Sequence, residues 1–154
     1  MRKTFRVLAY ALAVEVVVQA MAIAYAMASL GKWIDEDGGV LNKKVISASS
    51  PSFPGSGGFA LHGINGMLFI PVLTLALLIV SFFAKVPGGK KWAGILVGLV
   101  VLQVVLGIAL HGVPGVAPLH VLNAFALGVV AFLTGYRTRT ESAPAESMPA
   151  VANA

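Results

Sequence analysis

The chain has 154 residues, of which 58% are hydrophobic and 11% are charged, and its mean hydropathy is +0.89. A soluble domain with a polar exterior has more charged residues than this, so the composition indicates an integral membrane protein. The net charge is +5, but the basic residues lie at the ends of apolar runs, where they anchor helices, which excludes nucleic-acid binding. The absence of cysteine excludes disulfides and thiolate ligands.

Four apolar runs follow one another along the chain, at residues 7–30, 59–84, 92–111 and 118–136. A hydrocarbon core about 30 Å thick requires roughly 20 apolar residues per helix. The first run exceeds the 7–15 apolar residues, roughly, of a signal peptide core, so we expect it to be retained as a helix. The sequence therefore predicts an all-α membrane protein. Its single domain, residues 1–139, is an antiparallel bundle of four transmembrane helices that form two similar hairpins.

The connections between these runs carry further signals. The long loop at residues 31–58 is rich in turn residues, and it is either a mobile surface loop or a lid over the helix ends. We expect Pro71 to distort the second helix. Gly94 and Gly98 form a GxxxG arrangement, which predicts the close approach of another helix. Residues 140–154 are small and polar, so we expect a disordered cytoplasmic tail.

The distribution of Lys and Arg predicts the orientation. Eight of them lie before the first helix, in the turn at residues 85–91 and after the fourth helix, whereas the long loop holds three. This asymmetry places both termini in the cytoplasm of a multi-pass protein, which we expect in a prokaryotic plasma membrane. His62, His111 and His120 then all fall at the outer end of the molecule, which is the strongest positional signal in the sequence.

The motif L-H-x-x-N occurs twice, each time at the start of an apolar helix. In each copy an asparagine follows the histidine by three positions and a small residue follows it by four, so these side chains lie near one helix face. A flat macrocycle pressed against a helix needs a small residue there, and histidines on two helices suit the two axial positions of a haem iron. For each histidine alone, an interfacial side chain without a ligand is the alternative. The candidate cofactor-binding residues are His62, His120, His111, Asn65, Asn123, Gly66 and Ala124, with His62 and His120 as the metal ligands.

The two halves of the chain can be aligned. The alignment places Gln19 opposite Gln103 and His62 opposite His120. It implies two similar hairpins related by an axis along the membrane normal, and a cofactor would lie on that axis. His111, at the end of the third helix, could then donate a hydrogen bond to a haem propionate or act as an alternative ligand.

Glu15 lies near the middle of the first helix, where a carboxyl group is costly in a membrane. Gln19 is one turn away on the same face and can form a hydrogen bond with it. A proton path and a polar bond to another helix both remain open as roles. We expect the bond.

The stretch from Gln103 to His120 reads QxxLG, then a turn with glycine and proline, then a histidine early in the next helix. This pattern is similar to the helix pairs of the haem A synthase family. The resemblance implies a single four-helix unit that binds haem near the outer surface through His62 and His120. In that family a glutamate precedes the second-helix histidine by three positions and an arginine follows it, whereas this chain has Phe59 and Gly63. The resemblance therefore extends to haem binding and not to the synthase reaction.

We expect a b-type cytochrome unit that holds haem b between His62 and His120. Two axial ligands leave no position for oxygen, which favours electron transfer, haem handling or sensing over oxygenation. The alternatives are a divergent haem A synthase-like oxidoreductase, a cofactor-free membrane subunit or small transporter, and a copper site built from the three histidines. The expected partners are the lipid bilayer, a redox partner or quinone, and a second copy of the chain.

Overall fold

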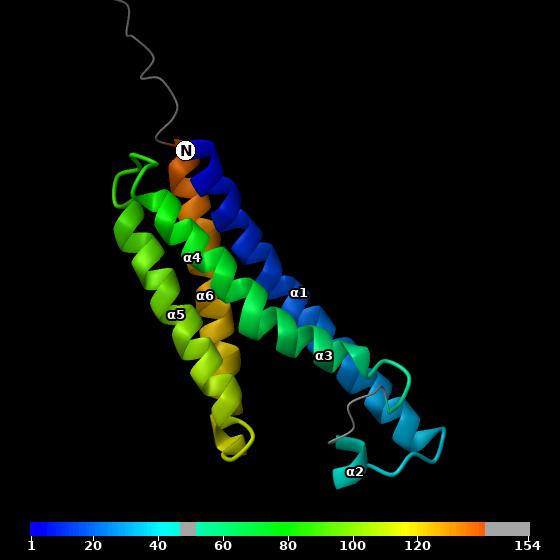
Figure 1. The fold of residues 1–154 in the computed structure, drawn as a ribbon. Helices are drawn as coiled ribbons and strands as arrows, with labels where there is room; N and C mark the ends of the chain where they lie inside the picture. The colour runs from blue at the N-terminus through cyan, green and yellow to red at the C-terminus, as the bar shows by residue number, and fades with distance from the viewer. Residues whose placement is uncertain (47–51, 141–154) are drawn as a thin grey trace, which may run out of the picture.

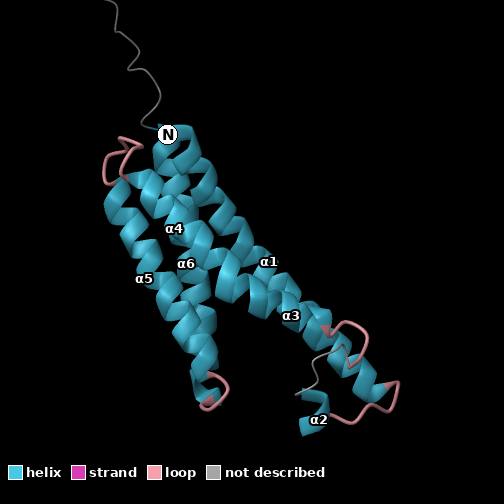
Figure 2. Ribbon diagram, viewed as in Figure 1, coloured by secondary structure: helices cyan, strands magenta, loops and turns pink. Residues whose placement is uncertain are grey.

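The computed structural model describes residues 1–46 and 52–140. Within these residues the regular elements are helices, with no strand (Figures 1 and 2). Four helical stretches are long and apolar enough to cross a membrane, which is the architecture of a multi-pass membrane protein. They are Arg2–Asp35, Gly57–Ser81, Gly89–Ala109 and Pro114–Thr138.

The elements follow one another with short connections. The first and third apolar runs form α1 and α5, and the second is divided into α3, a π-helical segment and α4. The fourth forms α6, which a 3-10 turn precedes, and a single helical turn, α2, lies in the long loop. The bounds are α1 Arg2–Asp35, α2 Lys43–Ile46, α3 Gly57–Ile64, the π-helical segment Asn65–Phe69, α4 Ile70–Ser81, α5 Gly89–Ala109, the 3-10 turn Pro114–Val116 and α6 Ala117–Thr140.

Helix α1 is longer than the sequence predicted. Its 34 residues extend over about 51 Å at 1.5 Å per residue, well beyond a hydrocarbon core of about 30 Å. A Lys32–Glu36 ion pair at 3.3 Å supports the last turn, and Trp33 stacks on Phe53 with ring centres 5.3 Å apart. The loop predicted to begin at residue 31 therefore begins at Glu36, and an aromatic contact ties it to α1. Residues 47–51 and 141–154, including most of the predicted tail, lie outside the described residues.

The predicted distortion near Pro71 takes the form of a π-helical turn. The N–H of Ile70 bonds the carbonyl of Asn65, five residues earlier. Pro71 has no N–H to donate to the carbonyl of Met67, and a wider turn directly before it absorbs that missing bond. The widened turn begins at Asn65, three residues after His62, so it shifts the side-chain directions of α4 relative to those of α3.

Helix α1 packs against α3, α4 and α6, while α5 packs against α4 and α6. The contact between α1 and α6 is close because α6 presents glycines to it: a Cβ added at Gly128 would lie 3.4 Å from Val16, and one added at Gly135 would lie 2.9 Å from the Tyr10 ring. The largest fully buried side chains fill the space among the four long helices. They are Phe5, Leu12, Leu77, Leu96, Leu127 and Thr74.

The GxxxG pair of α5 does not make the helix contact that its spacing predicted. A Cβ added at Gly94 or Gly98 would meet nothing within 4 Å, and both glycines are exposed. Within residues 1–46 and 52–140, therefore, no other helix approaches this face of α5.

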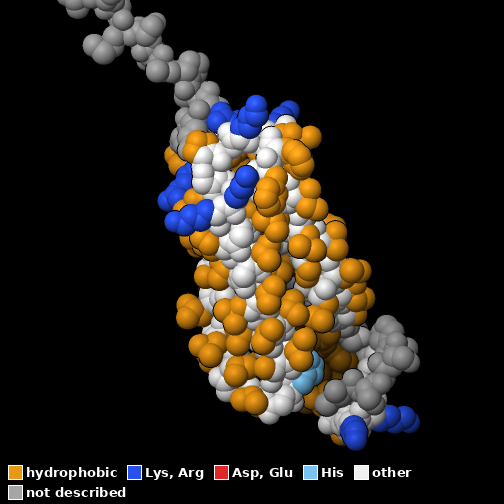
Figure 3. Space-filling model, turned by 60° about the vertical axis from the view of Figure 1, so that its left-hand side comes forward, with side chains coloured by type: hydrophobic (Ala, Val, Ile, Leu, Met, Phe, Trp, Pro, Cys, Tyr) orange, Lys and Arg blue, Asp and Glu red, His pale blue; other side chains and the backbone are white. Residues whose placement is uncertain are grey.

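The two ends of the molecule differ in charge. Figure 3 shows hydrophobic side chains over the middle, Lys and Arg gathered at the end that carries the N-terminus, and a smaller basic group at the opposite end. The last turn of α6 lies beside the N-terminus, whereas α3 and the start of α6 lie toward the opposite end, where the α1–α3 pair diverges from the α5–α6 pair (Figure 1). The three histidines belong to this diverging end.

Candidate functional site

The structure brings His62 of α3 and His120 of α6 together. Their ring centres are 6.3 Å apart and their planes are inclined by 58°. Both side chains are half-buried. The two imidazoles belong to different hairpins and meet where those hairpins begin to separate, so a group held between them would contact both halves of the chain.

On the second hairpin, the side chain of Gln103 links His120 to Asn123. The amide nitrogen of Gln103 lies 3.1 Å from Nε2 of His120, and its oxygen accepts from Nδ2 of Asn123 at 2.7 Å. Because a primary amide nitrogen can only donate, Nε2 accepts and the ring proton lies on Nδ1. Asn123 also donates to the backbone carbonyl of Leu99 at 2.9 Å, which fastens α6 to α5.

The opposite side of the His120 ring has no such partner. Its Nδ1 is buried without a hydrogen bond. Gly107 of α5 lies alongside, where an added Cβ would be 3.3 Å from Cε1 and 3.7 Å from Nδ1. Glycine at this position gives the imidazole room, and the unpaired N–H leaves the ring free to take a different orientation when a partner is present.

On the first hairpin, Gln19 of α1 occupies the matching place. The backbone carbonyl of Gln19 lies 3.2 Å from Nδ1 of His62. The orientation of the Gln19 amide that satisfies its neighbours directs the NH₂ group to Nδ1 of His62 at 2.7 Å, while the oxygen accepts from Nδ2 of Asn65 at 2.9 Å and from the N–H of Gly66 at 3.2 Å. Each glutamine thus joins the histidine and the asparagine of its own L-H-x-x-N motif.

Glu15 distinguishes the first hairpin from the second. Nδ2 of Asn65 donates to its Oε2 at 2.7 Å, so the predicted polar bond from Glu15 to another helix is present. On the register that pairs Gln19 with Gln103, Leu99 corresponds to Glu15, and its backbone carbonyl accepts from Asn123. The asparagine of each hairpin therefore bonds the neighbouring helix at the same level, through a carboxyl group in one case and a carbonyl in the other.

The other predicted site residues differ in their surroundings. Asn65 and Asn123 are 9% and 7% exposed and point to the glutamines, and a Cβ on Gly66 would lie 3.6 Å from the Gln19 side chain. Ala124 is half-buried on α6. His111 is exposed beyond the end of α5, with Nδ1 3.2 Å from the carbonyl of Ile108.

The three histidines are not grouped around one point. No group of three or more His, Cys, Asp or Glu side chains among residues 1–46 and 52–140, which include every histidine of the chain, is arranged to hold a metal ion. Copper would need such a convergent set, so the copper alternative is not supported.

Two imidazoles on different helices could together hold a haem iron. The ring centres of His62 and His120 are 6.3 Å apart, which is close enough for both rings to contact one bound group. For His62, the Gln19 NH₂ group that donates to Nδ1 places the ring proton on Nε2. Nε2 would become available to a metal only when Nδ1 instead donates to the backbone carbonyl of Gln19. For His120, Nε2 must first leave the Gln103 amide or the ring must turn.

Sequence reasoning aligned Gln19 with Gln103 but left both out of the site. The missed signal is that the same amide recurs at the same depth, one helix before each L-H-x-x-N motif. A side-chain amide can donate to one neighbour and accept from another. A glutamine in an apolar helix next to an L-H-x-x-N motif can therefore bond both the histidine and the asparagine of that motif.

The comparisons with known proteins give little further information. Residues 45–110, less than half of the chain, match a family of unknown function (DUF6220). The matched stretch contains His62, Asn65 and Gln103 but ends before His120. No curated protein matches the chain, and no solved structure matches it.

Proposed function

We propose that the chain is a b-type cytochrome unit of a prokaryotic plasma membrane, with haem b held between His62 and His120. In this proposal the four long helices form an antiparallel bundle of two similar hairpins, with both termini cytoplasmic and the histidines near the outer face. The observation that carries the proposal is the separation of 6.3 Å between two imidazole rings from different hairpins.

The residues around the histidines would control the two ligands. The backbone carbonyl of Gln19 would accept from Nδ1 of His62, which leaves Nε2 for the metal, while the Gln19 side-chain NH₂ would give up its bond to Nδ1. Gln103 would release Nε2 of His120. Gly107 gives this ring space to move, and Nδ1 forms no other hydrogen bond. When bound, haem supplies one-electron redox chemistry, and two axial histidines suit electron transfer or haem handling.

The resemblance to haem A synthase units agrees with these ligands. A synthase-like reaction is the less favoured form of the proposal, because Phe59 and Gly63 stand where that family has a glutamate and an arginine. A quinone or another redox protein would be the electron partner.

A cofactor-free membrane subunit is the second candidate, and a specific observation favours it. The polar atoms of Gln103, His120 and Asn123 already satisfy one another, apart from Nδ1 of His120. Hydrogen bonds of this kind join transmembrane helices. In this case the repeated Gln–His–Asn set would stabilise each hairpin without a ligand.

The absorption spectrum of the purified protein separates the two candidates. Under the cytochrome proposal the protein carries low-spin haem, and His62→Ala or His120→Ala each produces a high-spin spectrum or loss of haem. His111→Ala is the matched control and keeps the low-spin spectrum, since this side chain is exposed and bonds its own helix end. A protein that purifies without haem from haem-replete cells and does not take up added haem contradicts the proposal.

Substitution of Gln103 by leucine distinguishes the candidates further. If iron takes Nε2 of His120, the variant removes a competitor of the metal and retains a low-spin haem. If the set only joins helices, the variant leaves buried donors and acceptors on His120 and Asn123 unpaired and lowers stability with no spectral change.

The histidine variants also test the choice of ligands. A low-spin haem that survives His62→Ala but disappears in His111→Ala would show that a different pair binds the iron.

A further inference from the structure

The end of the molecule that carries the N-terminus has basic side chains from three separate segments. The described acidic residues lie elsewhere, with Glu15 inside α1 and the others after residue 34, at the opposite end. Figure 3 shows the blue side chains of this end around the edge of the hydrophobic surface. They belong to α1, to the turn between α4 and α5 with the start of α5, and to the last turns of α6: Arg2, Lys3, Arg6, Lys85, Lys90, Lys91 and Arg137.

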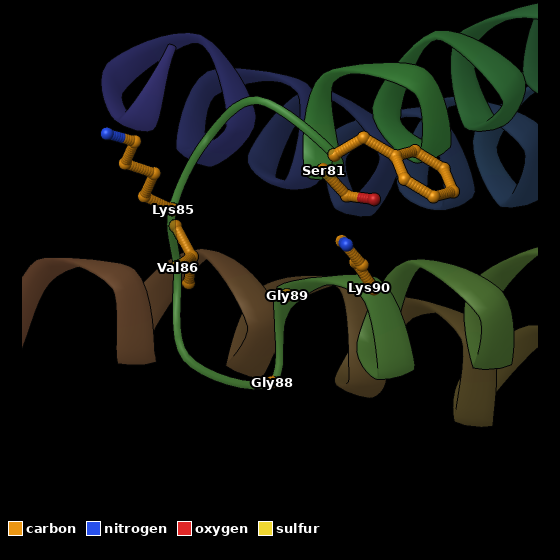
Figure 4. A pocket seen from close by; sticks show the side chains of 7 residues that line it. Ser81, Lys85, Val86, Gly88, Gly89 and Lys90 are labelled. Carbon is orange, nitrogen blue, oxygen red and sulfur yellow. The ribbon is translucent and has the colours of Figure 1, made fainter.

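Two hollows lie at this end, and both are lined by cations. One of about 340 Å³ lies at the turn between α4 and α5, and one of about 280 Å³ lies between the start of α1 and the end of α6. Figure 4 shows Lys90 extending from α5 toward Ser81 at the end of α4, with Lys85 on the connecting turn. The first hollow is lined by Ser81, Phe82, Lys85, Val86, Gly88, Gly89 and Lys90.

The turn that forms the first hollow is held in shape. Lys85 has a positive φ of 50°, and the Arg2 guanidinium donates to its carbonyl at 3.2 Å. Nζ of Lys90 lies 5.1 Å from the centre of the Phe82 ring. The first turn of α5 adds its partial positive charge at the same place. Contacts from α1 and from Phe82 thus hold the turn, with Lys90 extending over the opening and the Lys85 side chain directed away from it (Figure 4).

The neighbouring phenylalanines place this opening at the level of lipid headgroups. Phe82 and Phe83 are 56% and 64% exposed and follow directly after the apolar α4. Exposed aromatic rings at the end of a spanning helix lie in the lipid, and lysines just beyond them reach the interface. A molecule with an anionic headgroup and apolar chains would pair its charge with the lysines and cover the two phenylalanine rings with its chains.

We propose that the hollow between α4 and α5 binds the phosphate group of an anionic phospholipid, with Lys90 as a counter-ion and with the exposed Lys85 turning its side chain toward the opening as the second. Free phosphate shares the charge that these lysines recognise but lacks the chains that would cover Phe82 and Phe83. Basic pockets between transmembrane helices recognise lipid headgroups in this way. The site is independent of haem, because it lies at the opposite end of the molecule from the histidines.

Trp92 provides a local reporter of this site. A Cβ added at Gly88, in the wall of the hollow, would lie 3.6 Å from the indole of Trp92. The chain has two tryptophans, so Trp33→Phe leaves Trp92 alone and keeps an aromatic ring at residue 33. The full chain with this change is reconstituted with phosphatidylcholine or phosphatidylglycerol brominated near the headgroup, and the fluorescence quenching of Trp92 is measured.

The expected result is stronger quenching of Trp92 by brominated phosphatidylglycerol than by brominated phosphatidylcholine. The affinity ratio should fall about fivefold for each lysine removed by Lys85→Gln and Lys90→Gln. Lys43→Gln with Lys44→Gln, at the other end of the molecule, is the matched control and keeps the preference. Lys85→Arg with Lys90→Arg, which retains both charges, keeps it as well and shows that the fold of the turn survives substitution.

Equal quenching by the two lipids, or a preference that persists in the double glutamine variant, would overturn the proposal. Inorganic phosphate added to phosphatidylcholine vesicles is the second arm. A change in Trp92 fluorescence that depends on Lys85 and Lys90, without any preference for phosphatidylglycerol, would assign the hollow to a soluble anion and also reject the lipid.

Discussion

Glu15 and Leu99 occupy matching positions in the two hairpins, and each accepts a hydrogen bond from an asparagine through a different group. Asn65 donates to the carboxyl oxygen of Glu15, whereas Asn123 donates to the backbone carbonyl of Leu99. The second arrangement needs no polar side chain on the partner helix. The carboxyl group of Glu15 is thus explained as an acceptor for a buried amide, and it does not by itself form a proton relay.

Replacement of Glu15 by glutamine or leucine tests this role. Glu15→Gln keeps an acceptor oxygen, so the free energy of unfolding should change by less than about 0.5 kcal/mol. Glu15→Leu removes the acceptor of Asn65, and a loss of about 1 kcal/mol is expected, since hydrogen bonds within membranes are weak and Gln19 offers Asn65 a second acceptor. Denaturant titration of the protein in detergent measures both. Equal effects would contradict the role, and an ion flux abolished by Glu15→Gln would favour a transporter.

At the residue scale, the sequence revealed the histidines but not their partners. The repeated L-H-x-x-N motif marks His62 and His120 because both copies start an apolar helix. Asn65, at the start of the π-helical turn, and Asn123, in the unbroken α6, both donate to a glutamine of the neighbouring helix. The helical repeat places each asparagine near its histidine, but it does not show which side chain of another helix lies opposite, so the glutamines do not follow from the motif.

At the element scale, a glycine permits close helix packing only where another helix lies against it. Gly128 and Gly135 of α6 are seven residues apart and both lie against α1, whereas Gly94 and Gly98 of α5 have the more familiar spacing and no neighbour within 4 Å. Spacing alone shows that two glycines share a face. It does not show which face is turned toward another helix, because between Trp92 and Ala109 the only polar side chain of α5 is Gln103 and no polar side orients the helix.

A matched pair of substitutions separates these two faces. Gly135→Val should destabilise the protein by about 1–3 kcal/mol, because the new side chain would overlap the Tyr10 ring and force α1 and α6 apart. Gly94→Val introduces the same side chain into the same kind of helix in open space, so it should cost less than about 0.5 kcal/mol. Unfolding in detergent is the measurement for both.

The reverse order of the two effects would show that α1 and α6 are not packed as described. A change in particle size on Gly94→Val, measured by light scattering in detergent, would mark the open face of α5 as a contact between two copies of the chain.

At the scale of the whole molecule, composition and length predicted the architecture well, because the thickness of the bilayer sets the number of apolar residues per helix. The four predicted spans correspond to four helices long and apolar enough to cross a membrane. The ends were predicted less well: α1 continues to Asp35 and α4 ends at Ser81. An ion pair, an aromatic stack and the turn at Lys85 set these ends, and the apolar pattern contains none of them.

We predict the orientation of the molecule in the membrane from its charge, and single cysteines can measure it, since the chain has none of its own. Thr4 is exposed beside Arg2, Lys3 and Arg6, and Val40 is exposed in the loop that precedes α2. Neither substitution by cysteine alters the charge that sets the topology. The positive-inside rule places Thr4 in the cytoplasm, because eight basic residues lie on its side and three lie on the side of Val40.

A membrane-impermeant maleimide applied to intact cells should therefore label Val40→Cys and should label Thr4→Cys only after the membrane is permeabilised. A second cysteine variant at Leu41, which is 46% exposed, repeats the outer position and guards against a local loss of reactivity. Labelling of Thr4→Cys in intact cells, with Val40→Cys and Leu41→Cys protected, would reverse the orientation. His62 and His120 would then lie near the cytoplasmic face, and a cytochrome built on them would exchange electrons with partners on that side.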